Sequence, residues 1–253
     1  KNNTAVSNTT ISFGGPITFG ATTGAASTSI SLGDIDGDGL ADLAIVNSLS
    51  NTVTLYRNIS SGSPSFTLQT SLTTGTTPVA VQLVDIDKDG RADVVVVNSG
   101  SGNLSIFRSQ QPISGAWSFA SSTVGVGTNP SALATSDLDK DGDQDIVVAN
   151  AGSNNVSVLR NTSTQGIIAL GLSATLNSGA GPRGIVLADL NGDGFLDIAT
   201  ANSSANTISV FLNTNAATGT ISFTSNTDFS TGLGNVGPLA LAAGDIDGNG
   251  KVD

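Results

Sequence analysis

The sequence predicts an all-β protein built from repeated four-stranded units, the architecture of a β-propeller. The 253 residues are rich in Thr, Ser, Asn, Gly, Val and Ala, whereas strong helix formers are scarce and Glu and Met are absent. This composition favours strands and turns over helices. One acidic motif also recurs five times, with first residues separated by 51, 52, 52 and 56 positions. A repeat of about this length with several short strands is typical of a propeller blade.

Each repeat contains four segments of strand length. The first lies between a Pro and the acidic motif, as in residues 79–84 and 239–243. The second follows the motif and is almost continuously apolar, as expected for a strand covered on both faces: 43–46, 94–97, 146–149 and 198–201. The third alternates apolar and polar residues, as in 52–56 and 156–159. The fourth is the stretch around Phe66, Phe119 or Phe223.

The acidic motif has the form D-x-[DN]-x-[DN]-G-x-x-D. All twenty acidic residues are Asp, and nineteen of them lie in five such segments, which we name loops 1 to 5: 34–42, 85–93, 137–145, 189–197 and 245–253. Carboxylates at this density repel one another unless a cation lies between them. Alternating oxygen side chains, followed by a Gly that can adopt positive φ, allow the backbone to curl around a hard cation. We therefore predict about five structural Ca²⁺ ions, which would bring the net charge of −11 close to −1.

The predicted ligands follow from the positions within the motif. Positions one, three, five and nine supply side-chain oxygens, and these residues are Asp34, Asp36, Asp38 and Asp42; Asp85, Asp87, Asp89 and Asp93; Asp137, Asp139, Asp141 and Asp145; Asp189, Asn191, Asp193 and Asp197; Asp245, Asp247, Asn249 and Asp253. Position seven supplies its carbonyl oxygen, from Leu40, Arg91, Asp143, Phe195 and Lys251. The side chain of Asp143 is expected to face solvent. Because Asn191 and Asn249 replace Asp, loops 4 and 5 are expected to bind calcium more weakly.

The composition also argues against several classes of function. The sequence has no His, Cys or Glu, so the usual nucleophile and base pairs are missing and we expect no enzyme activity. The acidic balance and the lack of a basic patch argue against nucleic-acid binding, and no apolar run is long enough to span a membrane. Calcium loops of this kind fill reliably at the roughly millimolar Ca²⁺ found outside cells, which predicts an extracellular or cell-surface location.

The five loops, their period and the segment Phe13-Gly14-Gly15-Pro16 resemble the FG-GAP/VCBS repeat family, the calcium-binding β-propellers found in integrin α-subunit heads and in many bacterial surface proteins. The resemblance covers nearly the whole chain. It implies calcium at the loop positions named above and a noncatalytic role in adhesion, or in recognition of a protein or glycan ligand. Propellers of this family usually have seven blades, so residues 1–253 are expected to form one repeat array that is a fragment of a larger propeller.

Three other functions remain open at this stage: a lectin proper, a structural repeat that builds a surface filament by self-association, and the noncatalytic domain of a secreted enzyme. Trp117, the one Trp of the chain, is the best candidate for a ligand contact, although packing over the edge of a blade is the favoured explanation for it. Arg57, Arg108 and Arg160 lie at equivalent ends of third strands, and we interpret them as solvated strand ends.

Overall fold

The computed structural model of the chain describes residues 26–110, 116–215, 217–232, 234 and 237–252. These residues form sixteen strands in four antiparallel sheets of four strands each, and none of the described residues is helical. The prediction of an all-β fold with four-stranded units is therefore confirmed. The motif at residues 13–16 and the last loop residue, Asp253, lie outside the described residues.

Each sheet takes four consecutive strands from the chain, and we call the sheets blades 1 to 4. Blade 1 contains β1 (Ser27–Gly33), β2 (Asp42–Asn47), β3 (Thr52–Asn58) and β4 (Phe66–Thr73), and blade 2 contains β5 (Pro78–Val84), β6 (Asp93–Asn98), β7 (Asn103–Ser109) and β8 (Phe119–Gly125). Blade 3 contains β9 (Pro130–Ser136), β10 (Asp145–Asn150), β11 (Asn155–Asn161) and β12 (Leu170–Asn177), and blade 4 contains β13 (Pro182–Ala188), β14 (Asp197–Asn202), β15 (Thr207–Phe211) and β16 (Thr227–Ser230).

Burial within a blade follows the sequence pattern of its strands. Every residue of β6, β10 and β14 is buried, as expected for the apolar second strand, which has a strand on each side and another blade against its face. The third strands β3, β7 and β11 are buried over most of their length. The fourth strands β4, β8 and β12, at the outer edge, contain only exposed and half-buried residues, and every residue of β16 is exposed. Burial therefore decreases from the second strand to the edge of the blade.

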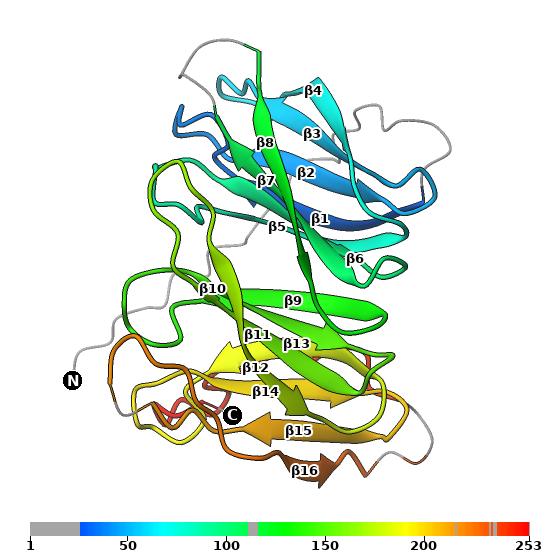
Figure 1. Cartoon of the computed structure of the whole chain (residues 1–253), viewed down its shortest axis with the longest axis vertical. Coiled ribbons are helices and arrows are strands. Elements are labelled where there is room, and N and C mark those ends of the chain that lie inside the picture. The colour runs from blue at the N-terminus through cyan, green and yellow to red at the C-terminus, as the bar shows by residue number, and fades with distance from the viewer. Residues whose placement is uncertain (1–25, 111–115, 216, 233, 235–236, 253) are drawn as a thin grey trace, which may run out of the picture.

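The blades are arranged through their first strands. The strand β1 contacts β5, β5 contacts β9, and β9 contacts β13, so the first strands of consecutive blades lie side by side. Polar side chains reinforce these contacts, because the backbone N–H groups of Val81 and Leu83 on β5 donate to the hydroxyls of Ser29 (3.2 Å) and Ser31 (3.0 Å) on β1. Figure 1 shows the blue and cyan strands of blade 1 at one end of the molecule and the yellow and orange strands of blade 4 at the other.

The hydrophobic core lies between consecutive blades. It consists of three clusters, one at each of the junctions between blades 1 and 2, 2 and 3, and 3 and 4. Each cluster includes the residue at position two of an acidic loop, namely Ile35, Ile86 or Leu138, and each of these side chains is fully buried. The apolar residue between two loop carboxylates therefore anchors its loop in the interface with the next blade.

Two of the predicted strands differ from the structure. Residues 239–243 are not a strand, because no described segment pairs with them and a strand forms only when its backbone groups find hydrogen-bonding partners. Phe223 makes an isolated bridge with Asn213, and the fourth strand of blade 4 resumes only at Thr227. The hydroxyl of Thr224 accepts the Leu212 N–H (3.0 Å) and so replaces a regular ladder contact there.

Candidate metal centres

Loops 1 to 4 each connect the first and second strands of a blade, as the sequence predicts. Their curvature comes from two positions with positive φ. Position six is Gly in all five loops, with φ between 82° and 87°. Position four also has positive φ, and there Lys88 (57°) and Lys140 (59°) adopt a conformation that L-residues rarely take outside Gly and Asn.

The carboxylate at position one holds the turn together. Its Oδ2 accepts the N–H of the Gly at position six at 2.7–2.9 Å in every loop, and its Oδ1 accepts the N–H of position five at 3.0–3.2 Å. In the same way, the side-chain oxygen at position five accepts the N–H of position seven. Both contacts are made within the nine residues of the motif, so the local sequence is sufficient to produce the turn.

The carboxylate at position nine connects the loop to the rest of its blade. The Oδ2 of Asp145 accepts the N–H of Leu138 (3.0 Å), and its Oδ1 accepts the N–H of Asn161 (2.8 Å) at the end of β11. The same two contacts occur at the other position-nine residues, with N···O distances of 2.8–3.0 Å: Asp42, Asp93 and Asp197. All four carboxylates are fully buried.

Burial raises the pKa values of these carboxyl groups. It raises the pKa of Asp42 and of Asp145 to about 6 and that of Asp93 to about 7, although the two backbone N–H donors at each carboxylate act in the opposite direction. The pKa values of Asp85 and Asp197 are raised for the same reason. A buried acid of this kind is favoured in its ionised form when a cation lies against it.

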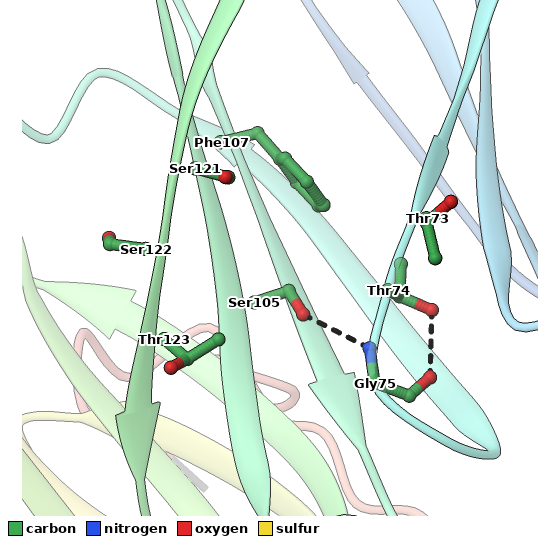
Figure 2. Close-up of a pocket in the computed structure, with 8 residues that line it drawn as sticks. All are labelled: Thr73, Thr74, Gly75, Ser105, Phe107, Ser121, Ser122 and Thr123. Atoms are coloured by element: carbon green, nitrogen blue, oxygen red, sulfur yellow. Dashed lines mark hydrogen bonds between the residues drawn. The ribbon is translucent and has the colours of Figure 1, made fainter.

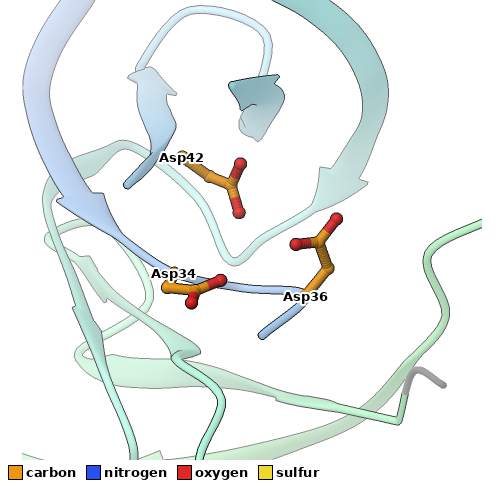
Figure 3. A group of neighbouring side chains, drawn as sticks. All are labelled: Asp34, Asp36 and Asp42. Carbon is orange, nitrogen blue, oxygen red and sulfur yellow. The ribbon is translucent and has the colours of Figure 1, made fainter. Parts of the chain in front are cut away.

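In loops 1 to 3 the carboxylates at positions one, three and nine converge. In each of these loops, one oxygen from each of the three carboxylates lies within 4.8 Å of the others: Asp34, Asp36 and Asp42; Asp85, Asp87 and Asp93; Asp137, Asp139 and Asp145. Figure 3 shows the three side chains of loop 1 around a common space. In loop 2, Asp87 is 1% exposed, and its Oδ1 has no hydrogen-bond partner. A buried carboxylate oxygen without a donor, in a set made only of oxygen ligands, fits a hard cation.

The position-five carboxylates do not belong to these groups. One oxygen each of Asp38, Asp89 and Asp141 accepts the backbone N–H of position seven. In loop 4, where Asn191 stands at position three, its amide donates to Asp193 Oδ2 at 2.8 Å, and hydrogen bonds from Phe195 N–H and Asn191 lower the pKa of Asp193. In the described part of loop 5, the acidic residues are exposed.

The three arginines are not solvated strand ends. Arg57 forms ion pairs with Asp36 Oδ2 (2.7 Å) and Asp38 Oδ2 (3.1 Å), and Arg160 bonds Asp139 Oδ2 (2.7 Å) and Asp141 Oδ2 (2.9 Å). Arg108 lies 3.7 Å from Asp87 Oδ2. This role was not predicted from the sequence, although each Arg stands 21 residues after the position-three Asp of its own repeat. That constant spacing is the signal that could have revealed it.

The side chains of Asp143 and Trp117 are also paired with other residues. The side chain of Asp143 is 15% exposed and pairs with Lys88 of loop 2 at 2.6 Å, so the expectation that it faces solvent is wrong. Trp117 packs against the core cluster between blades 1 and 2, and its indole N–H donates to Asp36 Oδ2 at 3.4 Å. This contact gives Trp117 a structural role at a blade junction.

A polar groove lies on another face of the junction between blades 1 and 2. It has a volume of about 350 Å³ and is lined by the end of β4, the turn at Gly75 and the outer strands of blade 2. Figure 2 shows Ser121 and Thr123 on the side of β8 that faces the groove, Ser122 on the opposite side, and the hydrogen bond from Gly75 N–H to Ser105 Oγ. Phe107 also lines the groove but is only 5% exposed. The groove therefore offers mainly hydroxyl groups.

Four consecutive blades, each with an acidic loop between its first two strands, define a β-propeller repeat protein. The FG-GAP-like repeat matches the chain four times, at residues 34–96, 85–148, 137–200 and 189–253. The chain therefore belongs to the FG-GAP-like repeat family, as the sequence resemblance predicted. No sequence among the curated proteins matches it.

The chain is also similar to solved structures. One is a functionally unknown protein from Desulfotomaculum acetoxidans (TM-score 0.56, 16% identity, covering 83% of this chain and 58% of the other). A candidate 6-phosphogluconolactonase from Bacteroides fragilis has a TM-score of 0.58 at 17% identity, with coverage of 83% and 56%. The periplasmic gluconolactonase of Pseudomonas aeruginosa has a TM-score of 0.54 at 17% identity, with coverage of 78% and 53%. The chain spans a little over half of each structure, and at these identities the likeness concerns the fold alone.

None of the described residues belongs to a helix long and apolar enough to cross a membrane.

Proposed function

We propose that the chain is a noncatalytic, calcium-stabilised β-propeller module of a secreted or cell-surface protein that acts in adhesion or in the recognition of a protein or glycan ligand. The proposed calcium binding rests on the convergence of three carboxylates in each of loops 1 to 3. The buried Oδ1 of Asp87, which has no hydrogen-bond partner, also supports it.

The ligand chemistry favours calcium. The converging groups are all carboxylate oxygens, without nitrogen or sulfur, which suits Ca²⁺ or Mg²⁺ rather than a transition metal. Calcium accepts several ligands in flexible geometry, whereas Mg²⁺ requires a nearly ideal octahedron. Positions one, three and nine would hold the ion, and positions five and seven would complete its coordination. A bound ion would neutralise the loop and fix the hairpin between the first two strands of the blade.

The calcium proposal is tested by thermal unfolding of the protein in EDTA, in Ca²⁺ and in Mg²⁺. Calcium should raise the melting temperature, since an ion that binds only the folded state contributes RT ln(1 + [L]/Kd) per site, and Mg²⁺ should raise it less. Asp87→Asn should reduce the increase, whereas Asp228→Asn, the same substitution at the one Asp outside the loops, should leave it unchanged. Identical melting curves in EDTA and Ca²⁺ would contradict the proposal.

The recognition part is supported by the polar groove at the junction between blades 1 and 2. Its hydroxyl groups can exchange hydrogen bonds with a glycan or a polar peptide, and rigid strands position them. Because the ring of Phe107 is almost fully buried, the groove lacks an exposed aromatic face on which a sugar could stack. Binding to a glycan array and to candidate surface proteins should therefore be weakened by Thr123→Trp, which fills the groove from an exposed position of β8 opposite Ser105. Binding that is unaffected by this variant would place recognition elsewhere.

The proposal that the protein is not an enzyme is supported by the absence of His, Cys and Glu from the sequence. In addition, the loop carboxylates accept hydrogen bonds from backbone N–H groups. Two structurally similar proteins are named as lactonases, so the absence of catalysis can be tested with a lactone substrate. When the protein is incubated with 6-phosphogluconolactone, acid release measured by pH-stat should equal the uncatalysed rate, with and without Ca²⁺. Hydrolysis proportional to protein concentration would overturn this part of the proposal.

A further inference from the structure

The arginine at the end of the third strand binds carboxylates of the acidic loop in its own blade. The guanidinium of Arg160 bonds the carboxylates at positions three and five of loop 3 (2.7 and 2.9 Å), and Arg57 pairs with the same positions of loop 1 (2.7 and 3.1 Å). The carboxylate partners at position three are almost completely buried, whereas the arginine side chains are 30% exposed. An ion pair that is half shielded from water interacts more strongly than a surface pair.

The next blade also donates hydrogen bonds to the position-three carboxylate. The N–H of Gly166, in the connection between β11 and β12 of blade 3, donates to Asp87 Oδ2 at 2.8 Å in loop 2. At the preceding junction Trp117 makes the corresponding contact with Asp36. The position-three carboxylate therefore contacts an arginine of its own blade and a connection of the next blade.

Blade 4 lacks both charged residues of the ion pair. Its residue equivalent to Arg57, Arg108 and Arg160 is Leu212, and its position-three residue is Asn191 instead of Asp, again 21 positions earlier. The positive and the negative charge are thus missing together. When the arginine is counted with the four ligand carboxylates, loops 1 and 3 carry a charge of −3, and loop 4 reaches the same value with three carboxylates and no arginine.

We propose that Arg57, Arg108 and Arg160 are built-in counter-cations of loops 1 to 3. Arg57 and Arg160 hold the carboxylates at positions three and five of loops 1 and 3 in place and set the calcium affinity of these loops to a level similar to that of loop 4. Arg108 lies beside the position-three carboxylate of loop 2. This inference rests on the proposed calcium binding. It revises the expectation that loop 4 binds more weakly because of Asn191, since a missing carboxylate is matched by a missing arginine. Loop 2 binds most weakly of the first three, because Arg91 adds a second guanidinium that contacts Asp89.

Trp117 allows loop 1 to be tested separately from the other loops. It is the only Trp in the chain, and its indole lies against Asp36, so its fluorescence reports calcium binding at this loop. The titration compares wild type, Arg57→Leu and the double variant Asp36→Asn with Arg57→Leu, which reproduces the pair found in blade 4. Arg183→Leu is the matched control, because Arg183 is exposed and lies at the end of β13 opposite to the loop.

The expected result is a lower calcium midpoint in Arg57→Leu, by roughly tenfold, the effect that Coulomb's law gives for removing one unit charge beside a divalent ion in a solvent-accessible site. The double variant should return the midpoint toward the wild-type value, and Arg183→Leu should not change it. A midpoint in Arg57→Leu that is unchanged or higher overturns the inference while leaving calcium binding intact. A wild-type protein whose fluorescence and melting temperature do not respond to Ca²⁺ overturns the proposed function itself.

A measurement in EDTA tests the counter-cation role without calcium. Arg57→Leu should melt at a lower temperature than Arg183→Leu, because the loop loses its positive charge while the control loses the same charge elsewhere. The double variant should recover part of this loss, since the carboxylate at position three is then neutral as well. Equal melting temperatures of Arg57→Leu and Arg183→Leu in EDTA overturn the inference. Circular dichroism checks that each variant retains its strands.

Discussion

The side chain of Asn161 joins two consecutive blades by donating a hydrogen bond of 2.9 Å from Nδ2 to the backbone carbonyl of Ile86. Asn161 ends β11 of blade 3, whereas Ile86 is at position two of loop 2 in blade 2. Ser109 and Asn213 make the same contact with Ile35 (3.1 Å) and Leu138 (3.0 Å) at the neighbouring junctions. Position two thus connects the blades through both its apolar side chain and its carbonyl.

Removing the side chain at position two should destabilise the protein. Ile86 is fully buried in the cluster between blades 2 and 3, so Ile86→Ala should cost about 2–5 kcal/mol in the free energy of unfolding. Ile246 occupies the same position of loop 5 and is 85% exposed, so Ile246→Ala should change it by less than about 0.5 kcal/mol. Urea denaturation in EDTA compares the two. A similar effect of both substitutions would show that position two does not anchor the blades.

The hydrogen bond between the blades should have a measurable effect of its own. Asn161→Ala leaves the Ile86 carbonyl and the Ser163 N–H without their side-chain partner, which should cost about 1–3 kcal/mol for each buried group that stays unsatisfied. Asn161→Ser should lose less, since the serine hydroxyl of Ser109 makes this contact at the equivalent position. Urea denaturation should therefore show that the wild type is the most stable, Asn161→Ser intermediate and Asn161→Ala the least stable. If Asn161→Ala were as stable as the wild type, this role of Asn161 would be contradicted.

Stability should depend on pH in opposite directions with and without calcium. Burial raises the pKa values of Asp42 and Asp145 to about 6 and of Asp93 to about 7, so the folded protein in EDTA binds more protons than the unfolded chain between pH 4 and 7. The associated stabilisation is present below the ordinary pKa and is lost as the pH rises through about 6 to 7. In EDTA, the urea midpoint should fall between about pH 5 and about pH 8.

In excess Ca²⁺ the trend should reverse, because protons then compete with the ion for the same carboxylates. The midpoint should be higher near pH 8 than near pH 5. The two series of measurements, made with the same protein, act as controls for each other. Parallel trends in EDTA and Ca²⁺ would mean that the buried carboxylates are not the groups that bind the ion.

Substitution of Trp117 should separate packing from ligand recognition. Trp117→Ala removes a side chain that packs between blades 1 and 2 and donates to Asp36, so it should lower the melting temperature. Trp117→Phe retains most of the packing and loses only the hydrogen bond, so it should have a smaller effect. Glycan binding that disappears in Trp117→Phe without a change in melting temperature would favour the lectin alternative and contradict a structural role.

Much of the fold could be predicted because its signals are local. The turn of each loop depends on a carboxylate and a Gly within nine residues, and the second strands are recognisable as continuous apolar runs. The strand predicted at residues 239–243 was wrong because strand formation depends on a partner segment, which local sequence does not reveal. The interrupted pairing at Thr224 was missed for a similar reason, since a hydroxyl replaced a backbone contact.

The sequence by itself determined the repeat, the strand-length segments of each unit and the convergence of the carboxylates at positions one, three and nine in loops 1 to 3, because the period, the apolar pattern of each segment and the nine-residue motif can all be read along the chain. Only the tertiary structure decided which groups meet across a blade or between blades. Arg160 reaches Asp139 after the chain has passed through two strands of the same blade, and Trp117 reaches Asp36 from the next blade, 81 residues away. Such contacts are set by the pairing of strands and the packing of blades, because only these bring distant side chains together.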